Sequence, residues 1–263
     1  MSIAPEIVEF AQELARAARE ETLRRWATGV APTGKPGSNG FDPVTEADIE
    51  AERAMRGLIE ARYPDHGITG EELPDRTAAG PYTWSLDPVD GTRSFICRLP
   101  TWVTLIGLLE HGRPVLGVVD APCLDEIYVG HGSDAVMIAG GERIGIRSSG
   151  CVAIAEARLS TTDPYLFEGA ELQAFDQLRG AARTVRFGHD GYAYARLAAG
   201  SIDLVVEAGL KPHDYNALIP LVAAAGGVVG NWRGEADCSD GKIVAAASQA
   251  LFDHAVGVLE SAA

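Results

Sequence analysis

The chain has 263 residues, of which 46% are apolar and 22% are charged, a globular composition that excludes wholesale disorder. Asp and Glu total 37 against 22 Lys and Arg, which gives a formal net charge of −15. Such a chain repels phosphate backbones and anionic lipid heads, which argues against nucleic acid and membranes as partners.

The N-terminal part of the sequence predicts two helices joined by a loop. Residues 4–28 place apolar side chains on one helical face. The glycines and prolines of 29–43 predict a loop. Thr45 to Asp48 resembles a capping box, which would start a second helix running to about Arg62. Residues 1–25 lack the apolar core of a signal peptide, and no apolar run could span a membrane, so we expect a cytoplasmic protein.

The rest of the sequence changes its pattern near residue 150. Before that point, apolar runs predict an antiparallel meander of strands at 83–87, 102–109 and 115–119, with shorter strands up to 147. After it, strands alternate with helices, which predicts a layered α/β unit. The strands are expected at 157–161, 184–187, 202–207 and 243–247, and the helices at 169–180, 192–199, 212–225 and 249–261. We therefore expect two subdomains, residues 1–149 and 150–263.

The four cysteines are Cys97, Cys123, Cys151 and Cys238. They are far apart and form no Cys-x-x-Cys pair, which argues against a disulfide framework and against a finger-type zinc site.

Acidic residues gather at four places where predicted elements begin or end. These places are Asp42 to Asp48, Gly70 to Glu72, Asp87 to Thr92 and Lys211 to Asp214. Mg²⁺ prefers oxygen ligands, and the scarcity of histidines favours it over zinc. Taken singly, each place has an ordinary alternative: Thr45 and Asp214 as helix caps, Glu71 and Glu72 as a solvated turn. Their joint occurrence favours a metal-dependent phosphoryl-transfer site.

The segment from Asp87 to Thr92 is the most informative of the four. Asp87 is expected at the end of a strand, and Asp90 would project from the same tight loop. Gly91 and Thr92 would open a helix whose free N–H groups make a seat for phosphate.

Four motifs make the sequence similar to the inositol monophosphatase family of magnesium-dependent, lithium-sensitive phosphatases. They are DPVTEAD (42–48), GEE (70–72), LDPVDGTRSF (86–95) and KPHDYNALIPLVAAAGG (211–227). The resemblance covers nearly the whole chain. It implies the layered αβαβα sandwich shared with fructose bisphosphatases, a homodimer, and hydrolysis of a small phosphate monoester.

The resemblance also implies roles for individual residues. The implied ligands of two to three Mg²⁺ ions are Glu71, Asp87, the Val89 carbonyl, Asp90, Asp214 and, for a weaker third ion, Asp42. Glu71 and Thr92, the latter paired with Asp48 or Thr45, would serve the in-line attack of an activated water. The amides of Gly91 and Thr92 would bind phosphate. Glu207 would contact the alcohol part of the substrate.

Three further segments are more similar to the bacterial histidinol-phosphate phosphatase branch than to the inositol branch: 159–167, 188–200 and 203–220. Histidinol phosphate carries an amine and an imidazole, which suits the acids Glu207 and Asp190 as binding groups, although Asp190 could equally be a helix N-cap. This reading would place the chain in histidine biosynthesis.

Three positions depart from the histidinol-branch pattern, namely Arg98, Gly191 and Asn231. Arg98 in particular favours the inositol branch. Two alternatives therefore stay open: an inositol-1-monophosphatase, and a family member that acts mainly by binding proteins in transcription complexes, with secondary catalysis.

Overall fold

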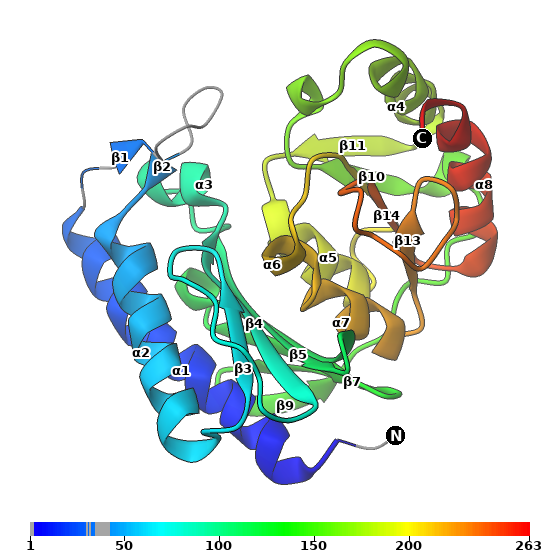
Figure 1. Cartoon of the computed structure of the whole chain (residues 1–263). Coiled ribbons are helices and arrows are strands. Elements are labelled where there is room, and N and C mark those ends of the chain that lie inside the picture. The colour runs from blue at the N-terminus through cyan, green and yellow to red at the C-terminus, as the bar shows by residue number, and fades with distance from the viewer. Residues whose placement is uncertain (1–2, 30, 32, 35–42) are drawn as a thin grey trace.

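The structure is a computed structural model that describes residues 3–29, 31, 33–34 and 43–263. Two sheets organise it, and helices cover their faces (Figure 1). Helices α1 (Pro5–Thr28) and α2 (Glu46–Arg62) form as the sequence predicts, and they lie side by side. Much of the predicted loop between them falls outside the described residues. Its described parts include the paired strands β1 (Thr33–Gly34) and β2 (Pro43–Val44), which were not predicted.

The first sheet has seven strands in the order β3-β4-β5-β6-β7-β8-β9. From β4 onward every neighbouring pair is antiparallel, so the predicted meander is confirmed. Strand β3 was not predicted and pairs with β4 in parallel. The strands are β3 (Gly67–Gly70), β4 (Tyr82–Asp90), β5 (Val103–Glu110), β6 (Arg113–Ala121), β7 (Glu126–His131), β8 (Asp134–Ala139) and β9 (Glu142–Gly145).

The second sheet has five strands in the order β11-β10-β12-β14-β13. Strand β10 pairs in parallel with β11 and β12, whereas β14 pairs antiparallel with β12 and β13. Strand β13 was missed by the sequence reading. The strands are β10 (Arg158–Thr161), β11 (Thr184–Phe187), β12 (Leu204–Glu207), β13 (Val228–Asn231) and β14 (Ile243–Ala246), and the helices α4 (Gly169–Ala181), α5 (Asp190–Ala198) and α8 (Gln249–Leu259).

The single helix predicted over 212–225 is wrong in one respect, because it is broken into α6 (Pro212–Tyr215) and α7 (Leu218–Ala224). Asn216 and Ala217 keep helical dihedral angles between the two pieces. Pro220 has no N–H with which to bond the carbonyl of the residue four before it, Asn216, so the hydrogen-bond ladder is interrupted there.

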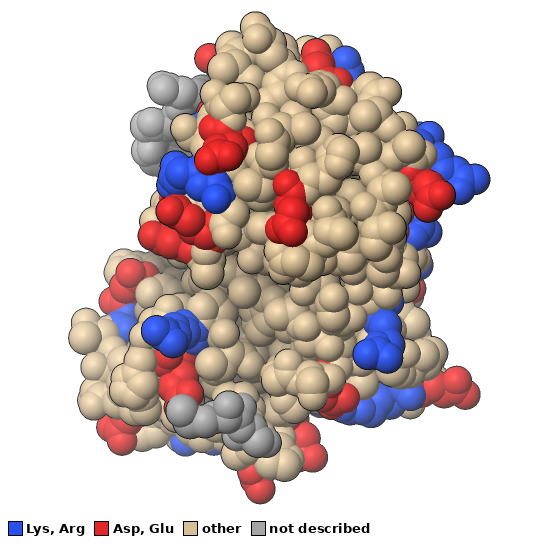
Figure 2. Space-filling view, turned by 90° about the vertical axis from the view of Figure 1, so that its right-hand side faces the viewer, with Lys and Arg blue, Asp and Glu red and all other residues tan. Residues whose placement is uncertain are grey.

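Hydrophobic residues are buried between successive layers, which run α1–α2, seven-stranded sheet, α5 to α7, five-stranded sheet, α4 and α8 (Figure 1). This is the αβαβα sandwich that the family resemblance implies. Among the described residues, no helix is both long and apolar enough to cross a membrane. On the face in Figure 2, Lys and Arg side chains are scattered among Asp and Glu, and the described residues gather no broad basic surface there.

A row of three glycines sets the spacing between the first sheet and the helices α6 and α7. Gly107, Gly117 and Gly130 lie opposite one another on β5, β6 and β7. A β-carbon on Gly117 would lie 1.8 Å from the carbonyl oxygen of Ala217, and one on Gly130 would lie 2.4 Å from the α-carbon of Leu221. The helix backbone therefore packs directly on the sheet backbone, with no room for a side chain between them.

We expect Gly117→Ala to lower the free energy of unfolding by about 2 kcal/mol or more, because α7 would have to move off the sheet. Gly57 is the matched control, since it is exposed in α2 with nothing within 4 Å of its would-be β-carbon. Gly57→Ala should instead raise the free energy of unfolding by up to about 1 kcal/mol. Urea unfolding of the two variants measures both effects. Equal stabilities would contradict the direct packing of the helix on the glycine row.

Candidate active site

The N-terminus of α2 supplies a buried carboxylate. Asp48 Oδ2 accepts hydrogen bonds from the Thr45 amide (2.9 Å) and the Thr45 hydroxyl (2.6 Å), which completes the predicted capping box. Asp48 Oδ1 is buried and has no hydrogen-bond partner among the described residues. Burial, and to a smaller extent the charge of Glu71, raises the pKa of Asp48 to about 6. Asp48 thus caps its helix and also lies near Glu71.

A buried ion pair on α2 holds the loop that carries Glu71. Glu52 is fully buried and accepts hydrogen bonds from Arg56 Nε (2.7 Å) and from the amide of Glu72 (2.8 Å). Arg56 in turn donates to the carbonyl of Leu73 (3.0 Å). The Glu71 amide donates to the Leu86 carbonyl at 3.2 Å, which brings Glu71 beside the end of β4. This support was not predicted from the sequence.

The end of β4 presents two acids on one tight segment. The pairing of β4 with β5 shifts register between Asp87 and Asp90. The Val89 amide donates to Asp87 Oδ1 (3.1 Å), and the Thr92 hydroxyl donates to the Val89 carbonyl (3.1 Å). Gly91 is left-handed at φ 84° and precedes the short helix α3 (Thr92–Ile96), as predicted.

Asp90 and Asp214 connect this segment to the rest of the fold. Asp90 Oδ2 accepts a hydrogen bond from the Gly191 amide (2.5 Å) at the start of α5. Asp214 Oδ2 accepts one from the Lys211 amide (2.6 Å) within the turn of α6. Asn216 Nδ2 donates to Ser85 Oγ on β4 (3.1 Å), which fixes α6 against the sheet. The expected role of Asp214 as a cap is therefore real, and the same residue faces β4.

The structure brings together four of the predicted metal-ligating side chains, Glu71, Asp87, Asp90 and Asp214, here called the carboxylate cluster. Ligand atoms of Asp87, Asp90 and Asp214 lie within 4.8 Å of one another, and so do those of Glu71, Asp87 and His213. Val89 lies on the same segment. Asp42 lies outside the described residues. His213 was not predicted as a site residue.

The electrostatics of the carboxylate cluster fit a site for cations. Burial raises the pKa of Asp87 well above its usual range, and the charges of Glu71 and Asp90 raise it further. Burial and the charge of Asp190 do the same for Asp90. The pKa of Asp214 is also raised, by burial first. Bound divalent cations would remove the repulsion that adds to these shifts, and oxygen donors are the ligands that Mg²⁺ prefers.

The predicted catalytic group is only partly assembled by direct contacts. Thr45 and Asp48 are hydrogen-bonded to each other. Among the residues that the structure describes, the Thr92 hydroxyl bonds to Val89 and to neither Thr45 nor Asp48. The pairing of Thr92 with one of them in catalysis stays a prediction.

The two acids predicted to bind substrate line one narrow pocket beside the cluster. Its lining residues are Asp90, Thr162, Asp190, Gly191, Tyr194, Glu207, Leu210, Asp214 and Leu218. Glu207 is buried and accepts hydrogen bonds from the Thr162 amide (2.8 Å) and from the hydroxyls of Thr161 and Thr162 (both 3.1 Å). Burial nevertheless raises the pKa of Glu207 to about 8.

Asp190 does not act as the helix cap that the sequence left as an alternative. The N-cap of α5 is His189, and Asp190 is the first helical residue, at φ 47°. The hydroxyls of Ser94 and Thr162 and the charge of Arg93 favour the ionised form of its side chain, but burial outweighs them. Burial raises its pKa to about 6. A β-carbon on Gly91 would lie 2.8 Å from Asp190 Oδ2, so Asp190 faces the predicted phosphate seat.

Tyr194 was missed by the sequence reading. Its hydroxyl is buried and has no hydrogen-bond partner among the described residues, although it lines the pocket with Glu207 and Asp214. It lies four residues after Asp190 in α5, which places both on one helical face. That spacing is the signal that could have found it.

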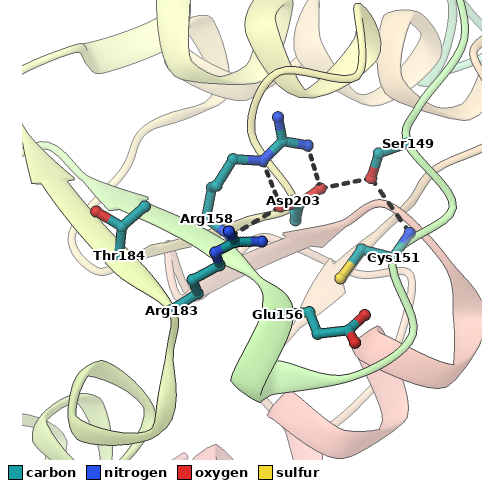
Figure 3. A pocket seen from close by; sticks show the side chains of 7 residues that line it. All are labelled: Ser149, Cys151, Glu156, Arg158, Arg183, Thr184 and Asp203. Carbon is teal, nitrogen blue, oxygen red and sulfur yellow. Dashed lines mark hydrogen bonds and ion pairs between the residues drawn. The ribbon is translucent and has the colours of Figure 1, made fainter.

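A second pocket, of about 480 Å³, lies apart from the carboxylate cluster (Figure 3). Its polar centre is an ion pair in which Arg158 Nε donates to Asp203 Oδ2 at 2.7 Å, and Ser149 also donates to Asp203. Burial opposes ionisation of Asp203, but these hydrogen bonds outweigh it and the pKa of Asp203 is lowered. Asp203 also accepts from the Arg158 amide (2.8 Å), so the pair secures the start of β10.

The sequence and the fold both resemble those of known proteins. The sequence model of the inositol monophosphatase family matches residues 4–262. The chain belongs to the inositol monophosphatase family. It is therefore a phosphoric monoester hydrolase, and its fold is the one that the family shares.

Relatives within the family are named for different substrates. The chain is 43% identical to a chloroplastic bifunctional phosphatase of Arabidopsis thaliana over 74% of its own length, and it spans only 56% of that relative. It is 36% identical to a histidinol-phosphatase of Chlorobaculum parvum, covering 82% of this chain and 83% of the relative. The structure of an inositol monophosphatase from Zymomonas mobilis superposes with a TM-score of 0.84 at 36% identity, covering 99% of this chain and 100% of that one.

The raised pKa values predict how the metal-free protein responds to pH. In the unfolded chain these acids have pKa values of about 4. An acid whose pKa is higher in the folded state contributes its full stabilisation at pH values below about 4. This stabilisation is lost as pH rises through about 6 for Asp48 and Asp190 and about 8 for Glu207. In the presence of a chelator, we expect the unfolding temperature to fall by at least about 5 °C between pH 5 and pH 8.

Magnesium provides the control for that experiment. Added at millimolar concentration, it should restore most of the lost stability at pH 8 and little at pH 5, where protonated carboxylates bind cations poorly. Differential scanning calorimetry at the two pH values measures both effects. A chelated protein that is equally stable at pH 5 and pH 8 would contradict the raised pKa values.

Proposed function

We propose that the chain is a Mg²⁺-dependent phosphatase that hydrolyses L-histidinol phosphate to L-histidinol and phosphate. The observation that carries this proposal is the pair of buried acids, Asp190 and Glu207, that line one pocket beside the carboxylate cluster. A substrate with an ammonium group and an imidazole would meet two carboxylates there, whereas a sugar or inositol would offer only neutral hydroxyls. Charge-assisted hydrogen bonds of this kind are stronger than neutral ones.

The roles of the chain's own residues follow from the contacts. The carboxylate cluster and the Val89 carbonyl would hold two Mg²⁺ ions, and Asp42 would help hold a third. The bound ions supply the charge that lowers the pKa of a water and stabilises the leaving alkoxide. Gly91 and Thr92 would seat the phosphate with their amides at the start of α3. The dyad of Thr45 and Asp48, with Thr92, would orient the attacking water and receive its proton.

Other parts of the proposal concern the protein as a whole. We propose that it works as a homodimer in the cytoplasm, within histidine biosynthesis, and that residues 1–149 and 150–263 form its two subdomains. The first subdomain would carry most of the metal and phosphate ligands. The second would add Asp214 and the residues that select the alcohol part.

Inositol 1-phosphate is the second candidate substrate. It is favoured by the likeness to the Zymomonas mobilis inositol monophosphatase, which equals in identity the likeness to the histidinol-phosphatase. Arg98 gives this candidate less support than its sequence position suggests. Its φ of 61° is the left-handed conformation that glycine adopts most easily, and its guanidinium lies over the Trp26 ring, in a different pocket from Glu207.

The decisive assay offers L-histidinol phosphate and myo-inositol 1-phosphate side by side with Mg²⁺, and measures phosphate release. We expect histidinol phosphate to be preferred, and Asp87→Asn to keep the fold while losing at least about a thousandfold in kcat, because Asp87 belongs to both ligand groups. A preference for inositol phosphate would overturn the proposed substrate. Near-normal activity of Asp87→Asn at saturating Mg²⁺ would overturn the proposed metal centre.

A second variant tests the proposed selection of the substrate by charge. Glu207→Gln should raise KM for histidinol phosphate about tenfold or more, since one charge-assisted hydrogen bond is worth about 1.5–3 kcal/mol. KM for inositol phosphate should change little. The matched control is Glu156→Gln, which removes an acid from the separate pocket of Figure 3. An equal loss on both substrates would show that Glu207 supports the fold rather than selecting the substrate.

A further inference from the structure

His213 is the one nitrogen donor within either group of ligand atoms that the described residues bring together. Its Nε2 lies 3.4 Å from Asp214 Oδ1 and 4.0 Å from Glu71 Oε1. A ligand atom of Asp87 lies within 4.8 Å of those of His213 and Glu71. Two atoms bound to one cation at about 2.0–2.2 Å lie no farther apart than roughly 4.4 Å. The 4.0 Å between His213 and Glu71 meets this limit, and an Asp87 atom within 4.8 Å needs to move by at most a few tenths of an ångström to join them.

The fold holds His213 firmly in this position. Pro212 begins α6, and the Lys211 amide bonds to Asp214, which closes the turn on both sides of His213. Asn216 ties the same turn to Ser85 on β4. The side chain of His213 is only 15% exposed, close to the 14% of Glu71. A ligand needs such support, because a mobile imidazole would lose entropy on binding.

A buried acid near Glu71 and Asp87 also has a carboxyl oxygen without a partner. Asp48 Oδ1 is buried and has no hydrogen-bond partner among the residues described, and Asp48 lies within electrostatic range of both Glu71 and Asp87. This orphaned oxygen is independent of the ligand spacing. A buried carboxyl oxygen without a donor beside these acids supports a bound cation in their neighbourhood.

The two ligand groups differ in chemistry. Asp87, Asp90 and Asp214 offer only oxygen, which suits Mg²⁺. Glu71, Asp87 and His213 offer two oxygens and an imidazole nitrogen, and imidazole suits Zn²⁺ and other transition ions better than Mg²⁺. The shared residue is Asp87, which would bridge the two positions.

We propose that His213 is a metal ligand and that the centre has two unlike positions, an all-oxygen one for Mg²⁺ and a mixed nitrogen–oxygen one that binds Zn²⁺ or a similar divalent transition ion more tightly. The inference rests on the proposed function only in taking the carboxylate cluster as a metal centre. It adds that the two positions of the centre differ in the metal ion that they bind most tightly. The alternative is that protonated His213 pairs with Asp214 and takes no part in metal binding.

The test compares the wild-type chain with His213→Gln and His213→Tyr, the latter keeping an aromatic ring without a nitrogen donor. His254→Gln is the matched control, because His254 is exposed on α8. Isothermal titration calorimetry would measure Zn²⁺ and Mg²⁺ affinities without substrate. X-ray absorption at the zinc edge of the one-zinc protein would report imidazole ligation. Circular dichroism would verify that the variants fold.

We expect both His213 variants to lose at least about tenfold in Zn²⁺ affinity, to keep Mg²⁺ affinity within about twofold, and to lose the imidazole signal. Unchanged Zn²⁺ affinity, or a wild-type zinc spectrum without imidazole, would overturn the role of His213 alone and favour the ion pair with Asp214. Wild-type protein that binds neither ion would overturn the metal centre as well, and with it the proposed function.

Discussion

Negative charges repel one another most strongly where water is excluded, and the carboxylate cluster gathers four acids at the ends of β3 and β4 and in the adjacent α6. The chain would relieve this repulsion by separating them, but three of the carboxylates accept hydrogen bonds from backbone amides outside the cluster, and the loop that carries the fourth is held by other contacts. Glu71 is fixed through the Glu52–Arg56 pair, and Asp90 through the amide of Gly191. The fold therefore maintains a deficit of positive charge, which bound cations correct.

The acidic motifs and the helix cap were predictable because they depend on neighbours in sequence. The capping box of Thr45 and Asp48 is a local hydrogen-bond pattern, and the meander follows from apolar runs separated by turns. The break between α6 and α7 could also have been predicted, because Pro220 lacks the N–H that would bond to the carbonyl of Asn216. Strand β13 has only four residues and follows two glycines. Its sequence is therefore too short to show the alternation that identifies a strand.

The contributions of His213, Tyr194 and Glu52 could not be predicted in the same way, because they depend on which direction a side chain points. His213 reaches Glu71 only because α6 packs against β4 and β3 runs parallel to it. Tyr194 becomes a pocket residue only when α5 lies between the two sheets. The spacing of the acidic motifs in the sequence indicated the chemistry of the site. Which other side chains line the site depends on how distant strands and helices pack together.

The row formed by Gly107, Gly117 and Gly130 has a consequence for judging other sequences of this family. The acids of the site can be read directly from their motifs, yet they meet only if α6 and α7 approach the sheet as closely as these three residues allow. A homologue that keeps every acid but carries a bulky residue in this row has lost the distance at which the acids cooperate. The three glycines therefore show, as the acidic motifs alone do not, whether a homologue can bring its acids together, although the glycines take no part in the chemistry.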